Sequence, residues 1–281
     1  MKTILLIMEI YQKIKVIFSF ILLCLFTLTS FYANANDREL IIQSTTSTRD
    51  SGFYEFIVPK FNELYQINVK VISVGTGQAI SNARNCDGDI LIVHSKVDED
   101  SFVNSGYGSI RKNLMYNDYV VIGPSNESSN FLNYSSVTEV FKNILAHSIF
   151  VSRGDDSGTH KAEKRIWNIS TINPGLYSKD NYLQTGQGMG ATLNIAVGLN
   201  AYTLSDRATW LKFKNKSTHK IVYEKDPLLF NQYGITIISD KKCPSINKEA
   251  AILFFDWITS DEAKNLINSY RVNGFQLFFT E

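Results

Sequence analysis

One polar segment organises the chain, and it consists of Ser152-Arg153-Gly154-Asp155-Asp156-Ser157-Gly158-Thr159-His160. The apolar residues 149–151 before it predict a short buried strand, and residues 161–167 after it predict a helix. The first backbone N–H groups of a helix lack internal partners, and the helix dipole places partial positive charge beside them. The segment therefore suits either an anion site built on Arg153 or an ordinary capped helix in which Arg153 pairs with a neighbouring aspartate.

Similar polar loops occur at residues 44–52, 73–78 and 185–190. Each is rich in hydroxyl groups or glycine and joins an expected strand to an expected helix start. A single loop of this kind is unremarkable, because Ser, Thr, Asp and Gly are the usual residues at helix N-caps. Several of them in one chain, one with an arginine, favour a cage of hydrogen-bond donors around a shared anion.

Strand and helix patterns alternate through the first part of the chain. Residues 39–43, 68–74 and 89–93 predict strands, and the last of these is almost wholly apolar, as is typical of a strand covered on both faces. Alternation of this kind predicts an α/β fold with mainly parallel sheets.

Two long extended runs, residues 114–123 and 233–238, bracket the middle third of the chain. They predict two α/β lobes joined by a two-strand hinge, with the second lobe inserted into the first. The expected boundaries are residues 36–118 and 235–281 for lobe I and residues 119–234 for lobe II. A cleft between two such lobes is a usual place for a ligand.

Residues 1–35 have the pattern of a cleaved signal peptide. Lys13 and Lys15 precede an apolar run at residues 16–28, and Ala-Asn-Ala at residues 33–35 forms a small-x-small cleavage site. The apolar run is short for a membrane span. We therefore expect the protein to be exported and periplasmic.

Charge and cysteine content narrow the functional classes. Removal of residues 1–35 takes away three lysines and one glutamate, so the net charge falls from +1 to about −1, which argues against a nucleic-acid partner. Cys86 and Cys243 remain, and the sequence leaves open whether they pair. No clustered His, Cys or carboxylate pattern indicates a metal-cation site, and we expect no cofactor.

Two enzyme motifs can be drawn from the chain, and both are weak. Residues 186–191 match the Gly-x-Gly-x-x-Ala dinucleotide fingerprint, with Asp206 near the ribose-binding position, but a poor buried strand precedes them. Ser157, His160 and Asp155 could form a hydrolase triad, yet they crowd one helix turn and no Gly-x-Ser-x-Gly elbow is present. The sequence therefore favours binding without catalysis.

In combination, the polar blocks resemble one known family, the periplasmic tungstate-binding proteins of ABC transporters (TupA type). The blocks follow the family's order and span nearly the whole chain after residue 35. They are residues 45–52, 74–79, 116–118, 152–160, 186–191 and 201–207. The block at 153–159 is also similar to a loop of phosphate-binding proteins, so this block alone does not separate the two ligands.

The resemblance implies a two-lobe type II periplasmic-binding fold that closes on one tetrahedral oxyanion and delivers it to an ABC permease in the inner membrane. In the family, the ligand is held by a Thr-Thr-Thr-Ser loop, here residues 44–47 with Ser44 in place of the first Thr, and by the arginine that corresponds to Arg153. The residues expected to bind the oxyanion are Ser44, Thr45, Thr46, Ser47, Thr76, Arg153, Ser157, Gly158, Thr159 and Gly188.

Tungstate is the expected ligand, and several alternatives stay open at this point. A molybdate, phosphate or sulfate carrier would have the same fold, and tungstate and molybdate differ very little in size and charge. An exported anion sensor or docking protein would bind the same ion without feeding a permease. We expect a monomer without catalytic residues.

Overall fold

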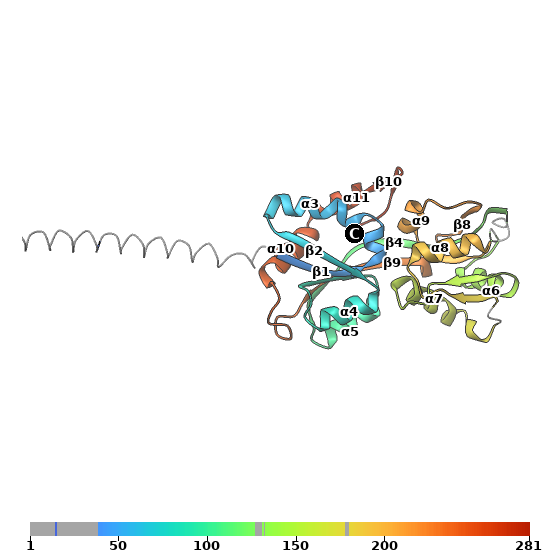
Figure 1. The fold of residues 1–281 in the computed structure, drawn as a ribbon, viewed down its shortest axis with the longest axis horizontal. Helices are drawn as coiled ribbons and strands as arrows, with labels where there is room; N and C mark the ends of the chain where they lie inside the picture. Colours follow the sequence, from blue (N-terminus) through green and yellow to red (C-terminus); the bar gives the residue numbers. More distant parts are fainter. Residues whose placement is uncertain (1–14, 16–38, 127–130, 132, 178–179) are drawn as a thin grey trace, which may run out of the picture.

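The structure is a computed structural model that describes residue 15, residues 39–126, residue 131, residues 133–177 and residues 180–281 (Figure 1). The predicted signal peptide at residues 1–35 lies outside these described residues, except for Lys15. Within the described ranges, no helix combines the length and the apolar character needed to cross a membrane.

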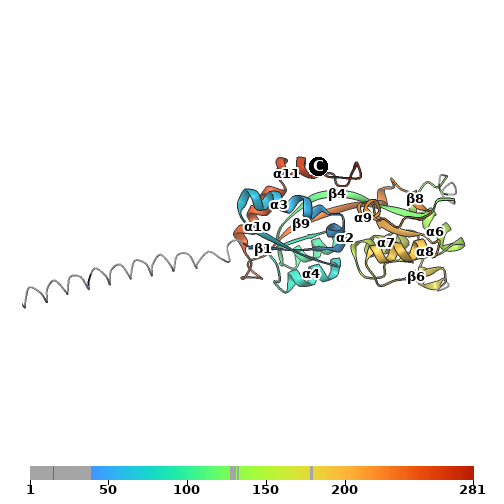
Figure 2. The ribbon, with the colours of Figure 1, turned by 45° about the horizontal axis from the view of Figure 1, so that its top comes forward.

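The described elements gather into two lobes that lie side by side (Figures 1 and 2). Lobe I contains β1 (Glu39–Thr45), α2 (Thr46–Asp50), α3 (Phe53–Tyr65), β2 (Asn68–Val74), α4 (Thr76–Arg84), β3 (Ile90–Val93), α5 (Lys96–Asn104), α10 (Lys248–Ile258), α11 (Asp261–Ser269), β10 (Arg271–Val272) and β11 (Phe275–Gln276). Lobe II contains α6 (Val137–His147), β5 (Phe150–Ser152), α7 (Gly158–Ile169), β6 (Tyr182–Gln184), α8 (Met189–Gly198), β7 (Thr203–Asp206), α9 (Arg207–Lys212) and β8 (His219–Tyr223). Two long strands run between the lobes, β4 (Gly108–Pro124) and β9 (Phe230–Ile238).

The sheet of lobe I is covered on both faces, as the apolar pattern of β3 predicts. Ile90 and Ile92 belong to the core that includes α3 and α10, whereas Leu91 and Val93 belong to the core that includes α4. Figure 1 shows α3 on one side of β1 and β2, and α4 and α5 on the other. Since β1 runs parallel to both β2 and β3, the loops that follow these three strands meet at one edge of the sheet.

The prediction of an α/β fold is confirmed, but the prediction of mainly parallel sheets needs a correction. Pairing is parallel for β1–β2, β1–β3 and β5–β6, and antiparallel for β3–β9, β4–β7, β4–β8 and β4–β9. For β4 and β9 the reason is the connection between the lobes: β4 leaves lobe I and β9 returns to it, so these neighbours run in opposite directions.

A buried carboxylate ties α7 to the strands of lobe II. Glu163 is 1% exposed and accepts hydrogen bonds from Ser152 Oγ at 2.7 Å, Trp167 Nε1 at 3.0 Å and Tyr182 OH at 2.7 Å. Burial raises the pKa of Glu163 to about 6. The carboxylate therefore fixes Ser152, the residue at which β5 ends and the polar segment begins.

Cys86 and Cys243 form a disulfide, which settles the pairing that the sequence leaves open. Their Cα atoms are 5.3 Å apart, and the bond joins the end of α4 to the segment before α10. Cys243 is fully buried and packs in the same core as Ala83 and Leu91. The disulfide thus links two distant parts of lobe I beneath one face of its sheet.

Reduction of this disulfide is expected to destabilise the protein, because the bond joins residues separated by 157 positions and restricts the unfolded chain. The chain-entropy model gives about 5 kcal/mol for a loop of this size, and typical losses are about 2–4 kcal/mol. Thermal unfolding of the 36–281 chain with and without dithiothreitol measures the effect, and the double variant Cys86→Ser/Cys243→Ser should match the reduced protein. Two reactive thiols in the denatured but unreduced chain would contradict the pairing.

Ionisation of Glu163 is expected to destabilise the folded protein as pH rises. The folded pKa of about 6 exceeds the ordinary value of 4.5, so this group's contribution is complete below pH ~4.5 and is lost as pH rises through ~6, by about 2 kcal/mol. The measurement is the melting temperature from pH 4 to 8 of the wild type and of Glu163→Gln, whose side chain cannot ionise. The exposed Glu63→Gln serves as the control, and identical pH profiles for the wild type and Glu163→Gln would contradict the assignment.

Candidate anion-binding site

Arg153 is the central charged residue of the polar segment between β5 and α7. Its side chain is 2% exposed and forms an ion pair with Asp155. Asp155 also accepts a hydrogen bond from the backbone N–H of Ser157 at 3.2 Å. Ser157 caps α7, because its hydroxyl accepts from the N–H of His160 at 3.3 Å. The segment therefore meets both descriptions drawn from the sequence: it is a capped helix start, and it holds a buried arginine in a fixed orientation.

The hydrolase alternative finds no support in this geometry. In the described structure, His160 Nδ1 accepts a hydrogen bond from the backbone N–H of Asp156 at 3.0 Å, and the Ser157 hydroxyl acts as a helix cap. The imidazole is therefore not placed to take a proton from Ser157.

The segment at residues 44–47 ends β1 and begins α2. Thr45 caps this short helix, because its Oγ1 lies 3.4 Å from the N–H of Thr48 and 2.7 Å from Thr48 Oγ1. Ser44 faces the core, where its hydroxyl donates to the carbonyl oxygen of Ile92 at 2.8 Å and contacts the Tyr54 hydroxyl. The Ser44 hydroxyl is thus engaged within lobe I, whereas Thr46 is only half-buried.

The start of α4 lies against the polar segment of lobe II. A Cβ atom at Gly77 would lie 2.7 Å from Asp156 Oδ2, and one at Gly75 would lie 3.8 Å from the backbone oxygen of Asp155. Thr76 stands between these two glycines and is fully buried. The loop after β2 is therefore in contact with the loop before α7.

His94 forms a second contact between the lobes. It follows β3, and its Nε2 lies 3.2 Å from Ser47 Oγ. On the side of lobe II, a Cβ atom at Gly158 would lie 2.2 Å from His94 Cε1, so only glycine fits where α7 begins. The predicted loops do not include His94, and its place at the carboxyl end of β3, next to β1, is the sequence feature that could have identified it.

Three polar side-chain atoms at the start of α4 and in residues 153–159 are buried and find no hydrogen-bond partner among the described residues; Ser73 Oγ, at the end of β2, is a fourth such atom in the polar loops. The three are Thr76 Oγ1, Arg153 Nε and Thr159 Oγ1, from a total of seven such atoms in the described structure. Buried unsatisfied groups are rare, because each costs roughly 1–3 kcal/mol. All three can donate a hydrogen bond, and all three belong to the set expected from the sequence. Donors of this kind suit an oxyanion, which only accepts hydrogen bonds.

Gly188 is the expected site residue that lies apart from this buried group. It caps α8 and is exposed, and no other described atom lies within 4 Å of a Cβ added to it. The residues before it do reach the polar segment, since Thr185 N donates to Ser152 O at 3.0 Å and Gly186 N donates to Arg153 O at 2.8 Å. The 185–190 loop therefore stabilises the backbone at Ser152 and Arg153 through these two hydrogen bonds.

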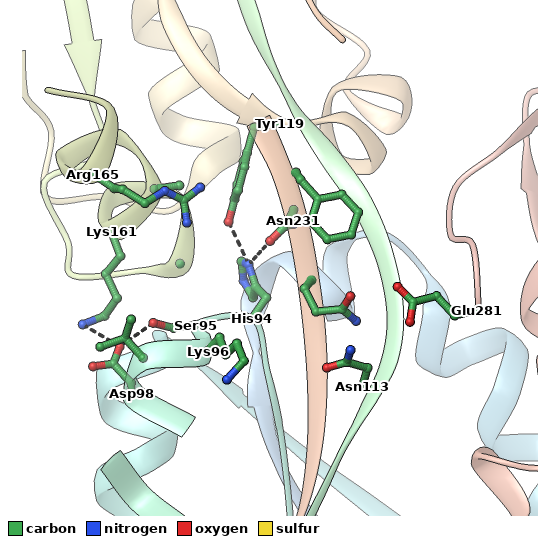
Figure 3. Close-up of a pocket in the computed structure, with 15 residues that line it drawn as sticks. His94, Ser95, Lys96, Asp98, Asn113, Tyr119, Lys161, Arg165, Asn231 and Glu281 are labelled. Atoms are coloured by element: carbon green, nitrogen blue, oxygen red, sulfur yellow. Dashed lines mark hydrogen bonds and ion pairs between the residues drawn. The ribbon is translucent and has the colours of Figure 1, made fainter. Parts of the chain in front are cut away.

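A cavity of about 630 Å³ lies beside the junction of the loops. Figure 3 shows His94 in this cavity, with Lys161 and Arg165 on the wall formed by α7. Lys161 reaches across to Asp98 of lobe I, with 3.2 Å between the charged atoms. Gly158 is the expected site residue that reaches the cavity wall. The cavity thus adjoins the buried donors through His94 and Gly158.

Comparison with known proteins agrees with this architecture. Residues 32–262 match the model of the PBP superfamily domain. The tungstate-binding protein TupA of Peptoclostridium acidaminophilum is 41% identical over 82% of this chain and 81% of its own length. A putative ABC transporter anion-binding protein of Haloferax volcanii is 38% identical over 88% of this chain and 73% of its own length.

A solved structure extends the similarity to three dimensions. The tungstate-binding protein TupA of Desulfovibrio alaskensis G20 superposes with a TM-score of 0.75 at 36% sequence identity, and the match covers 86% of this chain and 98% of that one. Both the sequence and the fold therefore agree with the resemblance carried by the polar loops. The chain belongs to the PBP superfamily and, within it, to the family of the TupA-type binding proteins.

Proposed function

We propose that this protein captures tungstate between its two lobes and delivers it to an ABC permease in the inner membrane. The observation that carries the proposal is the group of buried donors without partners: Thr76 Oγ1 from lobe I, and Arg153 Nε and Thr159 Oγ1 from lobe II. Relatives named as tungstate-binding proteins, with the same fold, support the choice of ion.

The chemistry of the donors suits an oxyanion that carries no proton. Arg153 supplies a fixed positive charge, and the starts of α4 and α7 add partial positive charge and backbone N–H groups. Both neighbouring carboxylates already have partners, since Asp155 pairs with Arg153 and Asp156 with Lys161 at 3.2 Å. The donor set of hydroxyl, N–H and guanidinium groups needs no proton from the ligand, so it suits a fully ionised dianion such as tungstate, molybdate or sulfate.

Closure of the lobes follows from the same donors. We take residues 36–118 and 235–281 as lobe I and residues 119–234 as lobe II, with boundaries inside β4 and β9. The oxyanion would be the acceptor shared by loops of both lobes, so it stabilises the closed form through contacts that the open form lacks. The Asp98–Lys161 ion pair across the cleft supports the same closed arrangement.

The remaining parts of the proposal concern the cellular setting. Residues 1–35 act as a signal peptide that directs export and is then cleaved. The mature protein is a monomer in the periplasm, and it binds its ligand without catalysis. The family's association with ABC transport supports a permease as its partner. Thr45, Thr46 and Ser47 at the start of α2 and Ser157 and Gly158 at the start of α7 complete the proposed oxyanion site.

Loss of the Arg153 guanidinium is expected to abolish tight tungstate binding. Each hydrogen bond to a charged group contributes roughly 1.5–3 kcal/mol, so Arg153→Ala should weaken binding by about 100-fold or more. Calorimetric titration of the 36–281 chain with tungstate in a phosphate-free buffer measures this change.

Arg165→Ala is the matched control, because this arginine lines the neighbouring cavity and its guanidinium donates to Leu228 O at 2.9 Å. Its loss should change the affinity by less than about threefold, since solvent screens an exposed charge. If both variants lost the same amount of tungstate affinity, the ion would bind in the cavity rather than at Arg153. A wild type that prefers phosphate or sulfate to tungstate would contradict the choice of ligand, and a wild type that binds none of these ions would contradict the anion site.

A further inference from the structure

The hydrogen bonds around Asn231 fix which ring nitrogen of His94 carries a proton. The Asn231 amide nitrogen faces three oxygen atoms, Asn117 Oδ1 at 2.7 Å, Asp206 Oδ2 at 3.3 Å and Tyr233 OH at 3.3 Å. The amide oxygen of Asn231 is therefore the atom that lies 2.9 Å from His94 Nδ1. Because an amide oxygen only accepts hydrogen bonds, this contact assigns the proton of neutral His94 to Nδ1, and the Tyr119 hydroxyl, 2.9 Å from Nδ1, then acts as an acceptor toward it.

This tautomer determines what the Ser47 hydroxyl can do. Neutral His94 has a bare Nε2, which can only accept a hydrogen bond, and Ser47 Oγ lies 3.2 Å from it. The Ser47 hydroxyl can then donate its single proton to His94, and its other partner, Thr45 Oγ1 at 3.1 Å, can donate to it. In this arrangement Ser47 has no proton left to donate to an oxyanion.

We propose that His94 is a positioning residue that takes up one proton from the solvent when the dianion binds. Protonated Nε2 donates to Ser47 Oγ, and the Ser47 hydroxyl turns its own proton toward the anion. One N–H bond forms on His94, and the bound complex carries one more proton than the free protein and free anion. This inference rests on the proposed function and concerns the same site.

The groups around the imidazole ring determine whether anion binding raises or lowers the pKa of His94. Burial lowers the pKa of His94 to about 4, and the positive charge of Arg153 acts in the same direction. Tyr119, whose hydroxyl lies 2.9 Å from Nδ1, and Tyr233, whose ring stacks on the imidazole, stay neutral because burial raises the pKa of both. The other charged residues nearby are Asp206 beyond Tyr233, and Lys96, Asp98, Lys161, Arg165 and Glu281 around the cavity.

A bound dianion reverses this balance. It offsets the charge of Arg153 and favours a cation at His94, so the pKa of His94 is higher in the complex than in the free protein. Affinity must then increase as pH falls toward the lower of the two pKa values. Between the two pKa values, uptake of one proton raises the affinity by up to about tenfold for each unit by which pH falls.

The test is calorimetric titration of the 36–281 chain with micromolar tungstate at pH 6 in two buffers of different ionisation enthalpy, MES and Bis-Tris. The wild type is expected to show a buffer-dependent enthalpy that corresponds to fractional proton uptake. His94→Gln is the matched variant, because its amide nitrogen at the Nε2 position can donate to Ser47 at every pH. This variant should bind tungstate without proton uptake. Its affinity still changes with pH where tungstate itself is protonated, so the difference between the wild-type and variant pH profiles reports His94 alone.

His94→Asn separates the two ends of the ring. It can keep the contact with Asn231 but has no group at the Nε2 position, so Ser47 Oγ keeps only Thr45 Oγ1 at 3.1 Å. The variant should therefore bind more weakly than His94→Gln and also without proton uptake. Tungstate binding by the wild type with no proton uptake, or with the same uptake as His94→Gln, would overturn the inference while the proposed function stands. Absence of binding by the wild type would overturn the proposed function itself.

A second measurement uses only the wild type, so it does not depend on whether the variants fold. Imidazole ¹⁵N shifts at pH 6 report the protonation state of each ring nitrogen. His94 is expected to appear as neutral, with the proton on Nδ1, in the free protein, and to move toward the imidazolium values when tungstate is added. An imidazole that stays neutral in the complex would overturn the inference.

Discussion

The structure depends on one constraint: buried hydrogen-bond donors from two lobes meet without enough acceptors. Arg153 is buried beside Asp155, and Thr76 and Thr159 present hydroxyl groups that no described residue satisfies. A folded chain tolerates such groups only where another gain offsets them. Under the proposed function the offsetting partner is an oxyanion, so the buried donors that destabilise the fold locally are also the groups that bind the ligand.

The strands between the lobes connect this site to the movement that the proposal requires. Asp206 is fully buried, and its carboxylate accepts from Asn117 of β4 at 2.7 Å and from Tyr233 of β9 at 3.0 Å. Asn231 extends the same network to His94, which contacts Ser47 at the start of α2. The two crossing strands and the loop of lobe I therefore share one continuous set of hydrogen bonds.

Sequence reasoning predicts the parts of this protein that depend on local pattern. Alternating apolar runs predict the strands, and the hydroxyl- and glycine-rich loops predict three of the buried donors without partners, because helix starts have a clear chemical signature. Contacts between residues that are distant in the sequence could not be predicted in this way. The engaged hydroxyl of Ser44, the exposure of Gly188, the antiparallel pairing of β4 and β9, and the place of His94 between Ser47 and Gly158 all depend on how the lobes pack.

The most direct test of the account is the position of tungsten in a crystal of the 36–281 chain grown with tungstate, located by anomalous diffraction at a tungsten absorption edge. The account predicts one strong peak whose oxygen atoms lie within hydrogen-bond distance of Thr76 Oγ1, Arg153 Nε and Thr159 Oγ1. A peak in the neighbouring cavity, against Lys161 and Arg165, with those three atoms still without a partner, would contradict it.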